Sequence, residues 1–278
     1  MSNKKYTNLV LSGGGLKGLC ALGALSFLNH NNLLNSITTY CGTSSGAIIS
    51  LFLNLGYTPD DIYDILYEID FSMLTNFDFE CFFNEVCIGL DKGDAIKYII
   101  GTLMIKKNFN INTTFKELYE KTQKKLIITG CCVNDATVEY FSYDKTPNMK
   151  IMTAIRITYS IPIIFKPVTH DNKLWIDGGC IDNYPIEIFQ KELDSTIGIL
   201  LDDQVSIDQF QDITEYLFNI IKCLQKGISI KTYEQYKKNT IYINQNISKN
   251  PMNFTVNNEI KKELFDLGKN AASKFISN

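Results

Sequence analysis

The sequence predicts an α/β fold, a three-layer sandwich in which helices flank a mainly parallel central sheet. Short apolar, β-branched runs alternate with longer segments of helical pattern. Two glycine-rich turns, at residues 12–18 and 42–46, each follow such a run and precede such a helix. The chain has 278 residues, 45% of them hydrophobic, which is enough to bury a sizeable core.

The individual elements follow from these patterns. The expected strands are short and apolar, and they lie at residues 8–11, 37–41, 126–133, 138–143, 165–169, 173–177, 196–201 and 240–243. The expected helices lie at residues 16–28, 46–55, 91–105, 114–121, 151–159, 207–232 and 258–276. Another helix should start after Thr58, which is followed by a proline and two acids. Residues 165–169 and 173–177 should pair as a hairpin.

Charge and composition exclude several classes of function. The net charge is −3, so no strong positive field is present to attract nucleic acid, and no nucleic-acid partner is expected. The eight cysteines sit in apolar runs without a CxxC pair, and only two histidines are present. Buried free thiols are therefore expected rather than a zinc site, and no metal or other cofactor is predicted.

No segment has the length and composition of a membrane anchor. No apolar run approaches the roughly 20 residues that a membrane span needs. The apolar stretch before Gly13 is too short for the core of a signal peptide. We therefore expect a cytoplasmic protein in a reducing compartment, and this expectation leaves peripheral contact with a membrane or a lipid aggregate open.

The first candidate for chemistry is the sequence Gly-Thr-Ser-Ser-Gly at residues 42–46. This G-x-S-x-G pattern lies between an expected strand and an expected helix, which is the context of a nucleophile elbow. Such a turn is tight, so the small residues Gly42 and Gly46 must flank it. Ser44 would then present its hydroxyl at the carboxyl end of the sheet, near the positive end of the helix. The alternative is a serine that only caps a helix.

The second candidate is the turn at residues 12–18, which reads Ser-Gly-Gly-Gly-Leu-Lys-Gly. Successive glycines leave backbone N–H groups uncovered, so that they can bind an oxyanion or a phosphate. Gly13, Gly15 and Gly18 also satisfy the dinucleotide pattern G-x-G-x-x-G. That use needs an acid about 20 residues further on, and no acid precedes Asp60. A turn that binds no ligand is the remaining alternative.

The third candidate is Asp177, which ends an expected strand and precedes Gly178 and Gly179. Such an acid can project into a site, although Asp-Gly is also common in ordinary turns. A serine nucleophile needs a base, and the usual one is histidine. His30 belongs to the expected end of the first helix, and His170 lies about seven residues, or roughly 20 Å along a strand, from Asp177. A carboxylate acting directly on the serine is therefore the simpler arrangement.

In this order, the three candidates resemble the patatin-like phospholipase family. The matching residues are Gly13-Gly14-Gly15-Leu16-Lys17-Gly18, then Gly42-Thr43-Ser44-Ser45-Gly46, then Asp177-Gly178-Gly179. Further agreement comes from the proline–phenylalanine segment at residues 161–165 and from Asn183-Tyr184-Pro185. The resemblance covers roughly residues 7–190, and the rest of the chain matches only loosely. Each pattern is weak alone, but their order is specific.

The resemblance implies the organisation of the chain and its activity. We expect one domain at residues 1–278, with a catalytic core at about 7–190 and an α/β extension at 191–278. The implied activity is a serine acyl hydrolase that cleaves fatty-acyl esters of phospholipids or other lipids without a metal. The expected partners are a lipid substrate and a membrane or lipid aggregate.

The resemblance also assigns roles to residues. Ser44 would be the nucleophile of a Ser–Asp dyad that forms an acyl-enzyme, and Asp177 would be the base. Gly13, Gly14 and Gly15 would donate N–H groups to the oxyanion.

The chain departs from the family at two places. Tyr159-Ser160-Ile161 stand where the family has small residues, and we expect them to narrow the acyl pocket. Lys17 replaces a frequent arginine, which is a mild change.

Several questions stay open at this stage. The dyad would also serve a neutral-lipid or small-ester hydrolase, and a catalytically weak lipid-binding or regulatory protein could keep the same fold. The aromatic segment at residues 63–90 is either a cap over the acyl site or a packed insert. The helix at 207–232 either covers the sheet or contacts a membrane.

Overall fold

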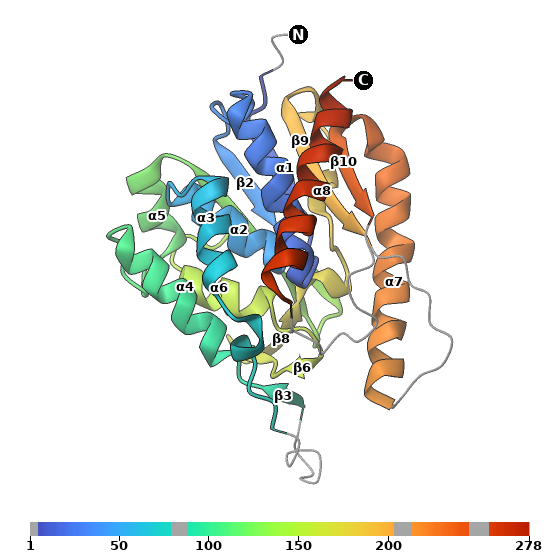
Figure 1. Ribbon diagram of the computed structural model, residues 1–278. Coiled ribbons are helices and arrows are strands. Elements are labelled where there is room, and N and C mark those ends of the chain that lie inside the picture. The colour runs from blue at the N-terminus through green and yellow to red at the C-terminus, as the bar shows by residue number, and fades with distance from the viewer. Residues whose placement is uncertain (1–4, 79–87, 203–212, 245–255, 278) are drawn as a thin grey trace.

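The computed structural model describes residues 5–78, 88–202, 213–244 and 256–277. A central sheet of mainly parallel strands has helices packed on both faces (Figure 1). The predicted α/β class with flanking helices is therefore confirmed.

The main sheet has eight strands within the described residues. The strands of the chain are β1 (Asn8–Leu11), β2 (Thr39–Gly42), β3 (Gly89–Asp91), β4 (Lys125–Cys132), β5 (Thr137–Ser142), β6 (Ile163–Phe165), β7 (Val168–His170), β8 (Lys173–Asp177), β9 (Thr196–Asp202) and β10 (Thr240–Asn244). The order across the sheet is β10-β9-β1-β2-β4-β8-β7, and β5 pairs with β4. The strands from β10 to β4 run parallel, whereas β8, β7 and β5 pair in antiparallel fashion. β3 and β6 form a separate parallel pair.

Helices cover both faces because alternate strand residues point to opposite sides. The α-helices are α1 (Gly18–His30), α2 (Ser45–Asn54), α3 (Pro59–Glu68), α4 (Asp94–Lys106), α5 (Phe115–Thr122), α6 (Ile151–Thr158), α7 (Ile213–Tyr236) and α8 (Asn258–Ser277). Leu9 and Leu11 of β1 pack into a large core with α1, α2 and α8. Val10 points into a smaller core with Tyr184 and with Tyr236 of α7.

Most element boundaries predicted from the sequence lie within a few residues of those in the structure. The predicted hairpin, however, was wrong at its first strand. The predicted strand at 165–169 is divided between two elements, because Phe165 ends β6 and pairs with Asp91 of β3. β3 was not predicted, since its three residues pair only with a segment distant in the sequence. Of the predicted helix at 207–232, residues 207–212 lie outside the described residues, and α7 continues to Tyr236.

Close packing of α1 and α8 holds the segment after residue 191 to the rest of the fold. The two helices lie side by side in front of the sheet (Figure 1). A Cβ atom at Gly23 would lie 1.8 Å from the carbonyl oxygen of Phe265, and one at Gly268 would lie 1.8 Å from that of Cys20. Only glycine at these two positions allows the helix backbones to approach so closely.

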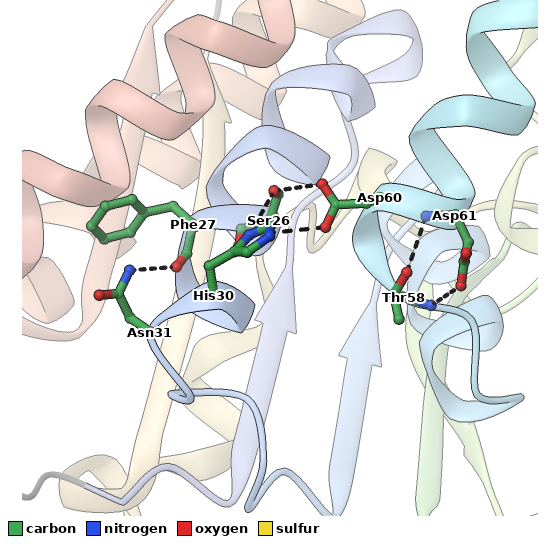
Figure 2. A network of polar contacts seen from close by, with 7 residues as sticks. All are labelled: Ser26, Phe27, His30, Asn31, Thr58, Asp60 and Asp61. Atoms are coloured by element: carbon green, nitrogen blue, oxygen red, sulfur yellow. Dashed lines mark hydrogen bonds and ion pairs between the residues drawn. The ribbon is translucent and has the colours of Figure 1, made fainter.

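A polar network joins the end of α1 to the start of α3 (Figure 2). The Ser26 hydroxyl donates to Oδ1 of Asp60 at 2.8 Å, and Nδ1 of His30 lies 2.8 Å from the Ser26 carbonyl oxygen. Thr58 and Asp61 form a reciprocal capping box at the start of α3, which confirms the predicted helix start. His30, expected at a helix end, is the last residue of α1.

A buried lysine joins α8 to the far end of α3. Lys261 is only 2% exposed, and its Nζ donates to the carbonyl oxygens of Tyr67 and Ile69, both at 2.7 Å. Carbonyl groups at a helix C-terminus lack partners in the helix and attract cations. The ammonium also lies 4.7 Å from the ring centroid of Phe71. The position of α8 therefore fixes the chain that follows α3.

No helix in the described ranges combines the length and the apolar composition that are needed to cross a bilayer.

We predict that Gly23→Ala destabilises the fold. Alanine favours a helix over glycine by about 1 kcal/mol, but its Cβ would overlap the Phe265 carbonyl oxygen at 1.8 Å. Overpacking of this kind costs about 1–3 kcal/mol, so after the gain in helix propensity the free energy of unfolding in urea should fall by up to about 2 kcal/mol. Gly227→Ala in α7 is the matched control, because a Cβ there meets no atom within 4 Å. An equal gain in stability from both variants would contradict this packing.

Candidate active site

Ser44 occupies a strained turn between β2 and α2. Its φ is 53° and its ψ is −125°, a region that residues with a Cβ rarely adopt. Strain of this kind costs about 1–3 kcal/mol and collects at functional sites. The turn between a strand and a helix is the geometry of a nucleophile elbow, as the G-x-S-x-G pattern suggested.

The glycines around the turn are required by close contacts with backbone and side-chain atoms. A Cβ at Gly42 would lie 2.5 Å from the carbonyl group of Gly46, and a Cβ at Gly46 would lie 2.5 Å from the Ser12 carbonyl oxygen. In the other candidate turn, a Cβ at Gly178 would lie 2.4 Å from Oγ1 of Thr129. Larger residues at these positions would force the turns apart.

Threonine side chains hold the Ser44 turn in place. The Ser44 N–H donates to Oγ1 of Thr158 at 2.9 Å. Thr129 donates through its hydroxyl to Thr43 at 2.8 Å, and the Thr43 hydroxyl donates to the Asp182 carbonyl oxygen at 3.2 Å. These bonds are buried or partly buried, so each lost partner would leave a polar group without water. Together they offset the strain of the turn.

Asp177 is buried at the end of β8 and contacts Ser44. Its N–H donates to the Ser160 carbonyl oxygen at 3.0 Å, which fixes the end of the strand. Its carboxylate accepts a hydrogen bond from the Gly179 N–H at 2.8 Å, and the Ser44 hydroxyl lies close enough to favour the ionised carboxylate. Burial raises the pKa of Asp177 to about 7, although the Gly179 N–H and the nearby Ser44 hydroxyl act in the opposite direction.

The sheet explains how Ser44 and Asp177 meet. β5 occupies one edge of β4 from Ile127 to Cys132, so β2 and β8 must share the other edge. β2 runs parallel to β4 and ends with Gly42 opposite Ile128. β8 runs in the opposite direction and ends with Asp177 opposite Gly130. The carboxyl ends of the two strands therefore face each other along β4.

The glycine-rich turn lies against the serine, but its N–H groups are not equivalent. The Gly13 N–H donates to the Asn183 carbonyl oxygen at 3.2 Å, and Asn183 Nδ2 donates to the Gly13 carbonyl oxygen at 3.3 Å. The Gly14 N–H donates to Oγ of Ser45 at 3.2 Å. The Gly15 N–H has no acceptor among the described residues, and Gly15 adopts a φ of 54°. Of the three N–H groups that were expected to bind the oxyanion, those of Gly13 and Gly14 therefore bond within the protein and stabilise the turn.

The last glycine of that turn begins a helix. Gly18 is the first residue of α1 and is buried. A Cβ atom there would lie 3.3 Å from Cδ1 of Ile49 in α2, so glycine lets α1 pass close to the helix that follows Ser44.

A cavity of about 340 Å³ is lined by Ser44, Asp177 and the glycine-rich turn. Apolar side chains from the surrounding helices form most of its wall, including Ile48, Ile65, Leu66, Ile99, Leu103 and Phe218. Pockets that bind small ligands enclose about 300–1,000 Å³ and are mostly apolar. The cavity is therefore suited to hold an extended apolar chain next to the Ser44 hydroxyl.

The aromatic segment that was expected to be a cap or a packed insert forms part of this wall. Phe71 and Leu74 line the cavity, whereas Tyr63 stacks on Phe265 at a ring separation of 3.9 Å. The aromatic segment also contains Phe79, Phe82 and Phe83, which lie outside the described residues.

Residues 159–161, at which the sequence differs from the pattern of small residues, also lie at the cavity. Tyr159 and Ile161 line it, and the Tyr159 hydroxyl donates to the Gly93 carbonyl oxygen at 2.9 Å.

Neither histidine lines the cavity. Nε2 of His170 lies 3.5 Å from the exposed carboxylate of Asp171, and His30 lies at the end of α1. Within the described part of the chain, no three His, Cys, Asp or Glu residues are grouped as metal ligands could be.

Sequence reasoning missed the residues that position the site. Thr129 and Thr158 lie in apolar runs, with no local sign that they bond to the Ser44 turn. Asn183 was noted only as part of the Asn-Tyr-Pro resemblance, and the structure shows that it joins the Asp-Gly-Gly turn to the glycine-rich turn. Its Oδ1 lies where a Cβ on Gly13 or Gly179 would collide with it, at 2.4 and 2.8 Å.

A model of the patatin-like phospholipase family matches residues 9–189. The chain belongs to this family. A probable lipid hydrolase, 463L of Invertebrate iridescent virus 6, is 37% identical over 187 residues, which are 66% of this chain and 63% of that protein. Protein R571 of Acanthamoeba polyphaga mimivirus is 31% identical over 285 residues, which are 96% of this chain and 93% of that protein.

The fold of this patatin-like protein also has solved counterparts. The crystal structure of VipD from Legionella pneumophila matches with a TM-score of 0.69 and 17% identity, covering 98% of this chain and 67% of that one. At this identity the likeness shows the fold alone. The family and the lipid-hydrolase relative support lipid hydrolase activity.

We predict that Asp177→Asn stabilises the protein at neutral and alkaline pH. The pKa of Asp177 is about 7 in the folded state and about 3.9 in an unfolded chain. The folded state therefore binds more protons between these values, and stability falls as pH rises through this window. Asparagine removes the cost of the buried charge, so the free energy of unfolding at about pH 8 should rise by about 1–4 kcal/mol.

Urea unfolding at about pH 8 and at about pH 4 measures this difference, which should shrink at the lower pH. Asp194→Asn, at an exposed position, is the matched control and should show no such gain. A loss of stability in Asp177→Asn at both pH values would contradict a buried charge as the main cost.

Proposed function

We propose that the protein hydrolyses fatty-acyl esters of lipids through a Ser44–Asp177 dyad. The observation that carries this proposal is the placement of the Ser44 hydroxyl beside the buried Asp177 carboxylate, at the lining of an apolar cavity. A nucleophile hydrogen-bonded to its base is the arrangement that covalent catalysis requires. Membership of the patatin-like phospholipase family supports the same assignment.

The first step is attack of the Ser44 oxygen on the ester carbonyl carbon. Asp177 takes the hydroxyl proton, and its raised pKa makes it a stronger base than an ordinary carboxylate. The C–O bond to the alcohol then breaks, and the proton passes from Asp177 to the leaving alkoxide. The product of this half-reaction is an acyl-enzyme with the fatty acid esterified to Ser44.

The second half-reaction releases the acid. Asp177 removes a proton from a water molecule, which attacks the acyl-enzyme carbonyl carbon. Collapse of the tetrahedral intermediate breaks the bond to the Ser44 oxygen, which recovers the proton from Asp177. The apolar wall of the cavity binds the acyl chain in both half-reactions, so that the carbonyl group stays next to Ser44.

The negative oxygen of the tetrahedral intermediate needs donors that are not already bonded. We assign this role to the N–H of Gly15, which has no acceptor among the residues described, and to that of Ser45, the first residue of α2. N–H groups at a helix N-terminus lack partners in the helix, and one such donor is worth about 10²–10³ in rate. Gly13 and Gly14 then shape the turn that presents Gly15.

A phospholipid suits the cavity better than a neutral lipid. Lys17, Lys222 and Lys226 contribute to its lining, whereas the acids in the lining are Asp177 and Asp202. Lys226 pairs with Asp202 at 3.6 Å. Lysine ammonium groups in the lining of the cavity favour a substrate that carries a phosphate.

We predict that Ser44→Ala and Asp177→Asn each lower the rate of hydrolysis of a chromogenic medium-chain ester by at least about 10³. Each variant lacks either the nucleophile or its base, while Ser195→Ala, outside the cavity, should keep wild-type activity. Mass spectrometry should also find a fluorophosphonate adduct on Ser44. If Asp177→Asn stays active while His170→Ala does not, the base is a histidine. If the folded wild type cleaves neither esters nor phospholipids, the lipid-binding alternative replaces the proposal.

The pH dependence of the reaction should report the ionisation of Asp177. The base works only when it is ionised, so kcat/KM for a soluble ester should rise with pH and level off above about 7. The matched control is the pH dependence of the wild-type far-UV circular dichroism spectrum, which should stay constant over the same range. A rate that does not change between about pH 5 and 8 would contradict Asp177 as the base.

A further inference from the structure

α7 differs from the other helices in the way that its two ends are used. Near its C-terminus, Tyr233 and Tyr236 pack in the smaller core against the sheet. Nearer its N-terminus, Phe218, Ile221 and Gln225 line the cavity that holds Ser44. The helix lies at one side of the molecule, across from α3 and α4 (Figure 1). The C-terminal part of α7 therefore covers the sheet, as one of the two alternatives from the sequence expected, and contact with a membrane stays a prediction.

A stripe of large apolar residues on α7 faces away from the protein. Apart from the neighbours Tyr216 and Leu217, its members follow one another at three or four positions, which places them on one face of a helix. Ile213 is 67% exposed and Leu224 is 63% exposed. The outer stripe consists of Ile213, Tyr216, Leu217, Ile220, Leu224 and Ile228.

The outer stripe carries no charge along its length. Between Ile213 and Ile228, the charged residues of α7 are Glu215, Lys222 and Lys226. Glu215 is buried, and both lysines are among the residues that line the cavity. Large apolar surfaces of this kind mark sites that bind proteins or membranes.

The position of the outer stripe favours a lipid surface. The same helix carries the stripe on its outward face and lines the cavity with its inward face, so a bilayer against the stripe would lie close to the cavity. Met73, which is 75% exposed, lies between Phe71 and Leu74, two residues of the cavity lining contributed by the chain after α3. Exposed apolar side chains therefore flank the cavity from two elements.

Charge also agrees with a lipid surface. Lys222 and Lys226 place positive charge on the cavity side of α7, and Lys226 shares its charge with Asp202 at 3.6 Å. Lysine side chains are long enough to extend toward lipid phosphates while apolar residues of the same helix contact acyl chains. No carboxylate of the stripe would repel an anionic headgroup. A second copy of the chain could cover an apolar stripe but would not use these lysines.

We propose that the outer stripe of α7 docks the protein on a phospholipid surface, next to the cavity that holds Ser44. This inference rests on the proposed lipid hydrolysis and adds the surface by which the enzyme reaches its substrate. The helix lies in the plane of the interface, with the stripe among the acyl chains.

The test replaces Leu217, Ile220 and Leu224 with glutamine, which favours a helix about as well as leucine. The control replaces three apolar residues of 39–60% exposure that do not line the cavity, Ile105, Val133 and Ile188, also with glutamine. Both triple variants are made with Ser44→Ala for binding and with intact Ser44 for activity. Binding is measured by co-sedimentation with vesicles of phosphatidylcholine, with and without phosphatidylserine.

The stripe variant should bind vesicles at least about 10-fold more weakly than the parent, while the control variant binds as the parent does. With intact Ser44, the stripe variant should cleave a soluble short-chain ester at the parent rate and vesicle phospholipid at least about 10-fold more slowly. Equal vesicle binding by the stripe variant and the parent would overturn docking and leave the proposed hydrolysis standing. Absence of ester hydrolysis in the parent would overturn hydrolysis, while sedimentation still tests docking.

Analytical ultracentrifugation tests the alternative that a second copy of the chain covers the stripe. If the parent is a dimer and the stripe variant is a monomer, a second copy covers the stripe, and the proposal is wrong. If both are monomers and only the stripe variant loses vesicle binding, the proposal stands.

Discussion

The site depends on one edge of a single strand. β4 pairs with β5 along one side, so β2 and β8 must share the other side and approach each other from opposite directions. Ser44 follows the end of β2, and Asp177 is the end of β8. Backbone pairing along β4 therefore brings Ser44 and Asp177 together, although they are distant in the sequence.

This arrangement has a thermodynamic cost that the chain tolerates. Ser44 sits in a strained conformation, and the burial of Asp177 raises its pKa to about 7. The threonines around the turn and the hydrogen bond from Gly179 offset part of this cost. A site that held the same groups in relaxed, solvated positions would leave Asp177 with an ordinary, lower pKa.

The sequence predicted the parts of the site whose requirements are local. Gly42 and Gly46 are needed because the turn is too tight for a Cβ, and such a requirement appears as a pattern around Ser44. The strands were also recognisable, since each is a short apolar run. The parallel class followed from their alternation with helices.

Other features depend on contacts that no local pattern records. Thr158 bonds to a residue 114 positions away, and a threonine in an apolar helix does not reveal its partner. β3 is too short to be recognised without β6. The glycine-rich turn was identified, but its hydrogen bonds to Asn183 and Ser45 were not, because they are made only when three separate turns meet.

The packing of α8 on α1 has a consequence for the order in which the molecule is completed. α1 begins directly after the glycine-rich turn, and its glycine at position 23 is covered by a helix that starts at Asn258. Ser44 and Asp177 leave the ribosome well before that helix does. A nascent chain therefore carries its reactive groups while the support behind the glycine-rich turn is still missing. The close contact between α1 and α8 can therefore form only after the rest of the sheet has been synthesised.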